Sequence, residues 1–246
     1  LMNLLKSILF NLHFYLLTTL LITFMLPTLI LPFKYFKIVS KVWTLILIFG
    51  MKIWLGLNIK IKGTFNKKKT YIIAMKHQSA WETIICTSLF EMPSIVLKKE
   101  LIYLPLIGLY FLKGKAIPIK RSNTFEALKR IIKMAKKSVN EGSSILIFPQ
   151  GTRVPLKSST KNYPYQSGVY FLYSKLNIPV LPVSHNAGLF WPKNSFIKFP
   201  SNLKSKTVTL EISNEIPPGL DKKTFMNKLE KIIEERTAFL ISSEKF

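Results

Sequence analysis

One histidine in the sequence lies five residues before a carboxylate. His77 and Glu82 belong to the segment His-Gln-Ser-Ala-Trp-Glu, which follows the apolar run 71–75. Five residues of regular helix would leave the two side chains about 140° apart, so they can meet only if His77 lies in a turn and Glu82 in the first helical turn after it. A carboxylate there fixes the imidazole tautomer and leaves the other ring nitrogen as a general base. Such a pair can also be purely structural, and the spacing alone does not decide.

A second segment, Phe-Pro-Gln-Gly-Thr-Arg at 148–153, offers a site for phosphate. Gly151 and Thr152 supply a turn and backbone amides, and Arg153 supplies a guanidinium beside Gln150. An ordinary strand-to-loop turn has the same composition. Two further segments come at expected strand ends: 114–121 places Lys120 and Arg121 there, and 178–183 is a short apolar strand that contains Pro182.

After residue 69 the sequence alternates short β-rich runs with amphipathic stretches, which is typical of an α/β domain. We expect strands at 71–75, 94–97, 116–119, 144–148, 180–183 and 207–212. We expect helices at 81–90, 124–140, 168–176 and 222–240. Asn123 with Glu126 resembles a capping box for the second helix, and Gly142 is placed to end it.

The first third of the chain is apolar and basic. Residues 7–33 carry no charge, and at 1.5 Å per residue that run exceeds the roughly 30 Å of a hydrocarbon core. Pro27 and Pro32 are expected to end or kink its helix. The next apolar stretch, 42–51, is too short to span, which favours a re-entrant hairpin or an interfacial helix. A cleaved signal peptide would have a shorter apolar region. We therefore expect membrane-anchoring helices in residues 1–57 and an α/β domain in residues 58–246.

The formal net charge of +24 arises from 36 Lys and Arg against 12 Asp and Glu, and predicts an anionic partner. Only four of these cations are Arg, so a lysine-rich genome composition is an alternative explanation for most of the excess. Nucleic-acid binding would require basic stripes interleaved with aromatics, whereas these lysines are scattered, so no nucleic-acid partner is expected. The single cysteine, Cys86, excludes a disulfide framework, and the spacing of the three histidines suggests no metal site.

In their order and spacing these segments resemble the 1-acyl-sn-glycerol-3-phosphate acyltransferases of the glycerolipid acyltransferase family. The family pattern is a histidine with an aspartate five residues on, a Gly/Ile…Arg block, Phe-Pro-Glu-Gly-Thr-Arg, and an apolar strand containing proline. It is matched here by His77 with Glu82, and by 114–121, 148–153 and 178–183. Residues 96–101, with Lys98, look like the family's lysine-containing segment. The resemblance spans about residues 70–215 and the apolar amino terminus.

Two positions depart from the family pattern. Glu82 stands where aspartate is commoner, one methylene further from the backbone. Gln150 replaces the glutamate of the second motif, which removes a negative charge beside Arg153 and keeps a hydrogen-bonding amide of similar length. This second change bears on rate or acceptor selectivity more than on the type of reaction.

The resemblance implies a mixed α/β sheet flanked by helices and an enzyme that acylates the sn-2 hydroxyl of lysophosphatidic acid to give phosphatidic acid. His77 would be the general base and Glu82 its orienting group, while Lys98, Arg121, Gly151, Thr152 and Arg153 would bind the acceptor phosphate, supported by Gln150 and Pro182. The acyl donor would be acyl-CoA or acyl carrier protein, with no other cofactor and no metal.

The same resemblance places the protein among membrane lipids, at a bacterial inner membrane with the catalytic domain on the cytoplasmic face. Three alternatives remain at this point. The acceptor could be another lysophospholipid, glycerol 3-phosphate or an aminolipid. The protein could instead be a membrane-attached nucleic-acid-binding protein, or a scaffold without enzymatic activity.

Overall fold

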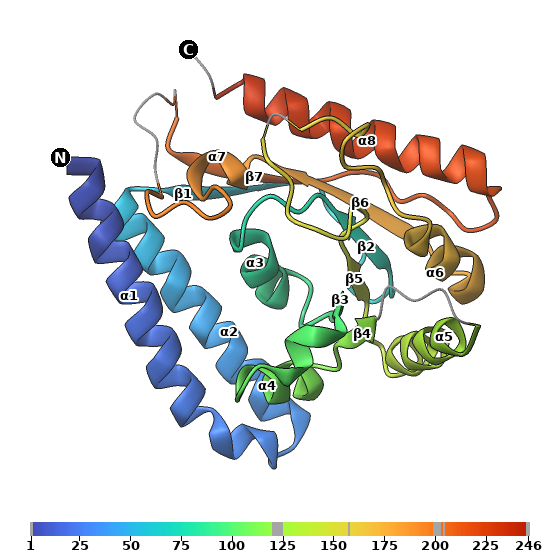
Figure 1. Cartoon of the computed structure of the whole chain (residues 1–246), viewed down its shortest axis with the longest axis horizontal. Coiled ribbons are helices and arrows are strands. Elements are labelled where there is room, and N and C mark those ends of the chain that lie inside the picture. Colours follow the sequence, from blue (N-terminus) through green and yellow to red (C-terminus); the bar gives the residue numbers. More distant parts are fainter. Residues whose placement is uncertain (1, 120–124, 157, 199–202, 204, 245–246) are drawn as a thin grey trace.

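The computed structural model describes residues 2–119, 125–156, 158–198, 203 and 205–244. Within these residues a seven-stranded sheet crosses the molecule in the order β1-β7-β6-β2-β5-β3-β4 (Figure 1). Neighbouring strands are parallel except β6 and β7, so the expected mixed sheet is confirmed. The strands are β1 (Asn58–Lys62), β2 (Ile72–Met75), β3 (Ser94–Lys98), β4 (Ile117–Ile119), β5 (Ile145–Ile147), β6 (Val180–His185) and β7 (Thr207–Ile212).

The central strands β2, β5 and β6 are buried along their whole length, because helices cover both faces of the sheet. The parallel register places Ala74 of β2 between Ile147 of β5 and Pro182 of β6. The carboxyl ends of the three strands therefore lie at one edge of the sheet, which is where open α/β sheets bind ligands.

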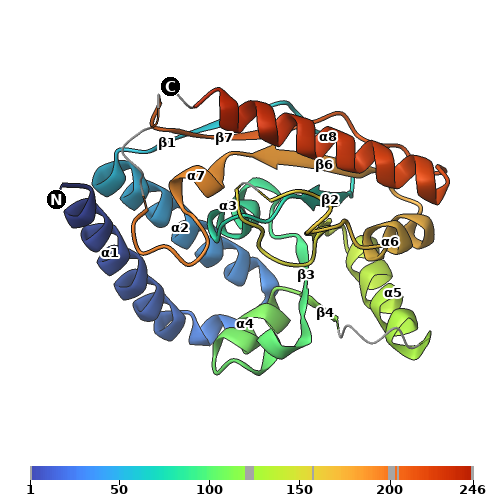
Figure 2. The same ribbon diagram turned by 45° about the horizontal axis from the view of Figure 1, so that its top comes forward.

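Two apolar cores form, one on each face of the sheet. One contains Trp81, Phe190 and the N-terminal Phe10, and the other contains Tyr173 and Phe225. Figures 1 and 2 show α8 running along the side of the sheet away from the N-terminal helices. The first core packs α3 (Trp81–Leu89) and α7 (Ala187–Phe190), and the second packs α5 (Phe125–Asn140), α6 (Gly168–Leu176) and α8 (Lys222–Ser242).

The chain begins with a helical hairpin formed by α1 (Met2–Phe24) and α2 (Phe33–Gly50). Its turn contains the short 3-10 helix η1 (Leu26–Leu29), which includes Pro27, and Pro32 directly precedes α2, so the first helix ends close to these prolines as the sequence predicts. The helices approach closely at Gly50, where a Cβ atom would lie only 2.5 Å from Nε2 of His13. His13 is thus packed between the helices, 3.3 Å from the carbonyl oxygen of Ile46.

The second apolar helix is longer than the sequence suggests, because the lysines at 34, 37 and 41 lie inside it. A π-helical turn, η2 (Met51–Leu55), continues α2, so Phe33–Leu55 and Met2–Phe24 are both long and apolar enough to cross a membrane. We expected residues 42–51 to be too short to span a membrane, but the helix that contains them is longer than this stretch, so the expected length was wrong. The hairpin also packs on the α/β domain: Oγ1 of Thr44 lies 2.8 Å from Oγ1 of Thr87 in α3.

All six expected strands and all four expected helices are present, with ends shifted by at most two described residues. Gly142, with φ +75°, ends α5 as predicted, while Asn123 of the expected capping box lies outside the described residues. The elements that the sequence reasoning missed are β1, the 3-10 helix η3 (Lys99–Tyr103), α4 (Ile107–Lys113) and α7.

Candidate active site

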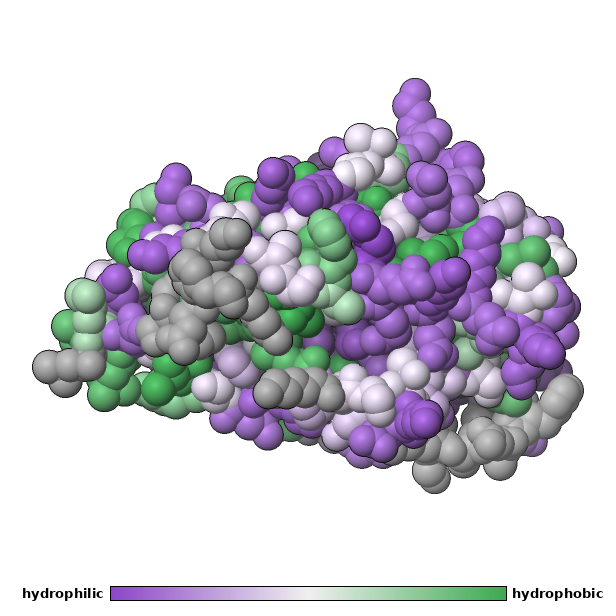
Figure 3. All heavy atoms as spheres, turned by 90° about the horizontal axis from the view of Figure 1, so that it is seen from above, coloured by the Kyte–Doolittle hydropathy of each residue, from purple (hydrophilic) through white to green (hydrophobic). Residues whose placement is uncertain are grey.

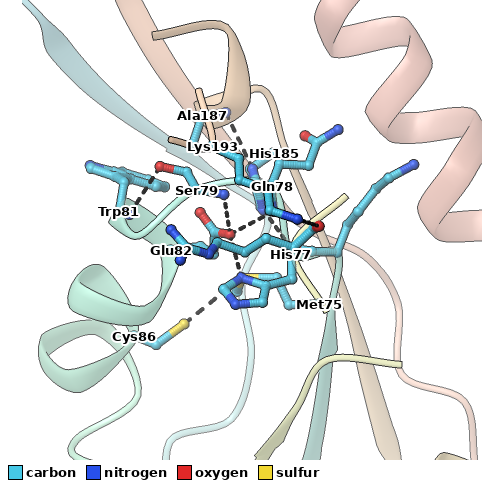
Figure 4. A network of polar contacts seen from close by, with 12 residues as sticks. Met75, His77, Gln78, Ser79, Trp81, Glu82, Cys86, His185, Ala187 and Lys193 are labelled. Carbon is cyan, nitrogen blue, oxygen red and sulfur yellow. Dashed lines mark hydrogen bonds and ion pairs between the residues drawn. The ribbon is translucent and has the colours of Figure 1, made fainter. Parts of the chain in front are cut away.

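The loop between β2 and α3 places His77 against Glu82. His77 follows the end of β2, and Glu82 lies in the first turn of α3 (Figure 4). Nδ1 of the imidazole lies 2.8 Å from Oε1 of Glu82, so the contact that the spacing predicts is present. The same oxygen accepts the backbone N–H groups of Gln78 and Ser79, each at 2.7 Å.

Glu82 is fully buried. Burial alone would raise its pKa, but the neighbouring imidazoles of His185 and His77 and the N–H group of Ser79 outweigh that cost, and the pKa of Glu82 lies below its ordinary value. An ionised carboxylate can only accept hydrogen bonds, so Nδ1 of His77 carries the proton. Nε2 of the neutral ring is then the basic nitrogen.

The basic nitrogen of His77 faces away from Glu82. Nε2 makes no hydrogen bond with the described part of the chain, and 19% of the side chain is exposed. The ring stacks on Phe148, with centroids 4.0 Å apart and planes 16° apart. The backbone N–H of Val154 donates to the carbonyl of His77 at 2.7 Å. The first and second sequence motifs are therefore held together by two contacts.

The second motif forms a tight turn at the end of β5. Gly151 has φ +66°, and its N–H donates to the carbonyl of Phe148 at 2.8 Å. Such a conformation favours glycine. Gln150 is buried, and its Nε2 donates to the carbonyl of Tyr163 at 3.0 Å, so the amide holds the turn against the following loop. Thr152 is half-buried in the same turn.

Arg153 lies in a group of cations that the sequence reasoning missed. Nζ of Lys193 donates to the carbonyl of Arg153 at 3.0 Å. Burial lowers the pKa of Lys198, and the charge of Arg153 lowers it further. Nζ of Lys198 donates to the carbonyl of Ser195 and lies 5.2 Å from the centroid of a Trp191 ring. In a chain with so many lysines nothing in the sequence distinguishes these two.

The loop that contains Lys193 and Lys198 is hydrogen-bonded to the N-terminal helix α1. The backbone N–H of Lys198 donates to Oγ of Ser7 at 3.1 Å, and Nδ2 of Asn11 donates to the carbonyl of Phe196 at 3.0 Å. The hairpin therefore supports one wall of the site as well as packing on α3.

The other residues singled out in the sequence are more dispersed. Lys98 is exposed at the end of β3, and no contact joins it to His77 or Arg153 within the described residues. Arg121 lies outside the described residues. Pro182 is buried in β6, where its carbonyl accepts the N–H of Ser213 at 3.0 Å.

His185 and Cys86 complete the buried surroundings of Glu82. Nε2 of His185 donates to the carbonyl of Lys76 at 2.7 Å, and Nδ1 accepts the N–H of Ala187 at 3.2 Å. Burial lowers the pKa of His185, which agrees with a neutral ring fixed by these two bonds. Burial also raises the pKa of the Cys86 thiol well above its ordinary value, so this thiol is unsuited to act as a nucleophile.

A histidine of fixed tautomer, next to an arginine-containing turn at the carboxyl edge of an α/β sheet, is an arrangement suited to general-base activation of a hydroxyl group. Residues 57–186 match the sequence model of a family described as Acyltransferase. This match covers more than half of the chain, and the chain belongs to that family.

Relatives of known name support this assignment. The chain is 36% identical to the 1-acyl-sn-glycerol-3-phosphate acyltransferase of Pseudomonas aeruginosa over 177 residues. This aligned region covers 71% of this chain and 68% of that protein. It is 28% identical, over 175 residues, to the enzyme of the same name from Limnanthes douglasii, covering 70% of this chain and 61% of the relative.

A solved structure shares the whole fold. The crystal structure of the 1-acyl-sn-glycerophosphate acyltransferase of Thermotoga maritima matches with a TM-score of 0.73 over 97% of each chain, at 20% identity. Because the match covers nearly all of both chains, the shared fold includes the N-terminal hairpin.

Proposed function

We propose that the protein transfers a fatty acyl group from a thioester to the sn-2 hydroxyl of 1-acyl-sn-glycerol 3-phosphate, giving phosphatidic acid. The observation that carries the proposal is the free Nε2 of His77, held beside the turn of Arg153 in a chain of the acyltransferase family. The names of the relatives from Pseudomonas aeruginosa and Limnanthes douglasii support this choice of acceptor.

His77 acts as the general base. Its Nε2 takes the proton of the acceptor hydroxyl while the oxygen attacks the thioester carbonyl. The tetrahedral intermediate then expels the thiolate, which receives the proton from the imidazolium as the free thiol. Glu82 keeps Nδ1 protonated and stabilises the imidazolium, and a base so placed contributes about 10²- to 10⁴-fold to the rate. No enzyme-bound acyl group is needed.

The acceptor phosphate is bound by cations at the carboxyl edge of the sheet. Arg153 is central, because its turn packs directly on His77 through Phe148 and Val154. Lys198 adds a second positive charge close by. The amides of Gly151 and Thr152, with Arg121 and Lys98, are the further ligands proposed from the sequence.

The acyl donor is acyl-CoA or acyl carrier protein, and the reaction needs no other cofactor. Its balance supports this, since the thioester supplies the acyl group and leaves as a thiol. An apolar cavity of about 270 Å³ lies between the hairpin and α3, with Trp43, Ile84 and Ile95 among its lining residues. A cavity lined by apolar side chains suits the hydrocarbon chain of one of the substrates.

The enzyme works at a membrane. Its two N-terminal helices are apolar enough to enter a bilayer and expose large apolar side chains such as Leu12, Tyr15 and Phe24. An anionic leaflet attracts the basic first third of the chain. We place the protein at a bacterial inner membrane with the α/β domain on the cytoplasmic face, where soluble acyl donors are present.

The proposal is tested with the purified full-length protein, lysophosphatidic acid and either acyl donor. His77→Ala should abolish turnover, and Arg153→Ala should raise the KM for the acceptor. Arg130→Ala, which changes an exposed arginine on α5, is the matched control and should change neither constant. Turnover by His77→Ala close to that of the unmodified enzyme would refute the mechanism. An unchanged acceptor KM in Arg153→Ala would refute the phosphate site.

A further inference from the structure

An apolar segment that follows β3 is turned outward. Residues 101–112 contain no charged side chain, and the segment forms η3 and α4. An uncharged run of this length is usually buried in a core, yet six of its large apolar side chains are between 39% and 70% exposed. These six, which we term the α4 surface, are Tyr103, Leu104, Leu106, Ile107, Leu109 and Leu112.

The segment holds this conformation through its own packing. At Gly108 a Cβ atom would lie 1.8 Å from the carbonyl oxygen of Ile102, so α4 packs directly on η3 through the glycine. Leu106, just before α4, has φ +59°, a conformation that costs a leucine energy. The exposed side chains are therefore presented by a packed element.

The α4 surface continues the apolar face of the N-terminal hairpin. Nζ of Lys113 donates to the carbonyls of Leu29 and Leu31 at 3.0 and 2.7 Å, which caps the hairpin turn. The hydroxyl of Tyr110 donates to the carbonyl of Ile22, and its ring stacks on Phe36 at 6.3 Å. Figures 1 and 2 show α4 beside the end of the hairpin where α1 turns into α2.

Lysines lie at both ends of the α4 surface. Lys98 and Lys99 precede it, with Glu100 beside them, whereas Lys113 and Lys115, which follow it, are bound to the hairpin carbonyls and to Glu141. Lysines at the ends of an apolar segment place their stems along hydrocarbon and their ammonium groups among anionic headgroups. The opposite side of the molecule differs, since the face over α8 is mostly hydrophilic (Figure 3).

We propose that the α4 surface inserts into the same membrane leaflet as the hairpin and forms a second, separate membrane contact. The inference rests on the proposed action at a membrane, and adds a contact made by the α/β domain itself. Because η3 begins directly after Lys98 at the carboxyl edge of the sheet, insertion of α4 brings that edge to the level of the headgroups. A bilayer-held acceptor would then reach His77 without leaving the membrane.

Site-directed labelling tests the insertion. Cys86, the single cysteine, is fully buried, so an introduced cysteine takes a nitroxide label selectively. Leu109→Cys should become accessible to oxygen and protected from an aqueous nickel complex when phosphatidylglycerol–phosphatidylcholine vesicles are added to the full chain. Leu12→Cys on α1 reports on the hairpin. Phe239→Cys on α8, at 51% exposure against 49% for Leu109, is the control that should stay aqueous.

Each outcome bears on one proposal. Leu109→Cys in water while Leu12→Cys is in lipid would overturn the second contact and leave the membrane location intact. Both labels in water would refute the membrane location. Protection of Leu109→Cys from both reagents, with spin–spin broadening between chains, would mean that a second copy covers the surface and would also overturn the inference.

Kinetics give an independent readout. Leu109→Gln/Leu112→Gln should raise the apparent KM for acceptor in vesicles by about tenfold, and leave turnover of a short-chain acceptor dissolved as monomers unchanged. Ile61→Gln/Phe239→Gln removes two side chains of matched exposure on β1 and α8, and should change neither value. Equal KM values for vesicle acceptor in the two double variants would overturn the inference.

Discussion

The imidazole of His77 lies flat on the ring of Phe148, with the centroids 4.0 Å apart. Glu82 fixes this imidazole at Nδ1, and Phe148 covers one of its faces, so the free Nε2 has a defined direction. The two rings come from different strand ends, β2 and β5, and their contact joins His77 to the turn that contains Arg153. The orientation of the imidazole therefore depends on both motifs together.

Loss of the Phe148 ring should reduce the rate without abolishing it. Phe148→Ala leaves His77 and Glu82 in place but removes the surface that orients the imidazole, and misplacement of a catalytic group can cost about 10- to 100-fold in kcat. Phe148→Tyr keeps the ring and should restore most of the activity. Steady-state kinetics with both variants measure this. A KM effect with unchanged kcat would show that Phe148 acts on binding instead.

Glu82→Gln should have a larger effect on kcat. The amide keeps the length of the side chain but loses the charge that stabilises the imidazolium, so we expect a fall of about 10²- to 10⁴-fold. Glu82→Asp keeps the charge and should be less harmful, although the carboxylate must reach His77 with one methylene fewer. If Glu82→Asp were as inactive as Glu82→Gln, distance and not charge would be the decisive property.

Lys198 should contribute to acceptor binding. Lys198→Ala removes a cation near Arg153, so the KM for a phosphate-bearing acceptor should rise several-fold, on the order of 1 kcal/mol for a charged contact. An acylglycerol without phosphate should be unaffected. Lys231→Ala, on the exposed face of α8, is the control. A matching rise with the phosphate-free acceptor would assign Lys198 to structure.

Acid should destabilise the fold through His185. Burial lowers its pKa and outweighs the opposing effects of Glu82 and of the hydrogen bond to the carbonyl of Lys76, so below the ordinary value of 6.5 the unfolded chain binds a proton that the folded chain does not. The free energy of unfolding must then fall as the pH drops below about 6.5, and be unaffected by this group above it. Glu82 acts only below its own ordinary value of 4.5, because its folded pKa is lowered.

His185→Gln tests this dependence. The glutamine amide can still donate to the carbonyl of Lys76, but it does not titrate. The difference in thermal midpoint between the unmodified protein and the variant should change between pH 7.5 and 5.0, and be constant from pH 7.5 upward. A difference that is constant over the whole range would rule out His185 as the titrating group.

The sequence was most informative where a pattern depends on one strand or one turn. The strands β2 and β5 are apolar throughout, and β6 is apolar as far as Val183, because both faces of the sheet are buried; such runs can be recognised without the rest of the chain. The spacing of His77 and Glu82 allows them to meet if His77 lies in a turn and Glu82 in the first helical turn after it, and the strand-to-helix turn meets both conditions.

Features that depend on packing between distant segments could not be predicted. The edge strand β1 does carry a local signal, because Asn-Ile-Lys-Ile-Lys alternates polar and apolar residues, but its pairing with the distant β7 could not be predicted from that segment. Lys198 has no local signal, and its position depends on a loop whose backbone is hydrogen-bonded to Ser7 on α1. The α4 segment has the composition of a core element, and only the structure shows its side chains to be exposed.

The α/β domain shares one of its apolar cores with the N-terminal hairpin. Phe10 on α1 is completely buried and packs edge-on against Trp191 at 5.3 Å, in the same core as Trp81 beside the active site. Phe10→Ala should therefore lower the stability of the whole protein by about 3–5 kcal/mol, measured as thermal or denaturant unfolding in detergent. Phe24→Ala, on the same helix but 76% exposed, should leave the stability unchanged.

Removal of residues 1–57 would expose this core and also remove the membrane-binding helices. Loss of activity in such a truncation would therefore not by itself demonstrate anchoring. Equal stability of Phe10→Ala and Phe24→Ala would instead mean that the hairpin is an independent anchor.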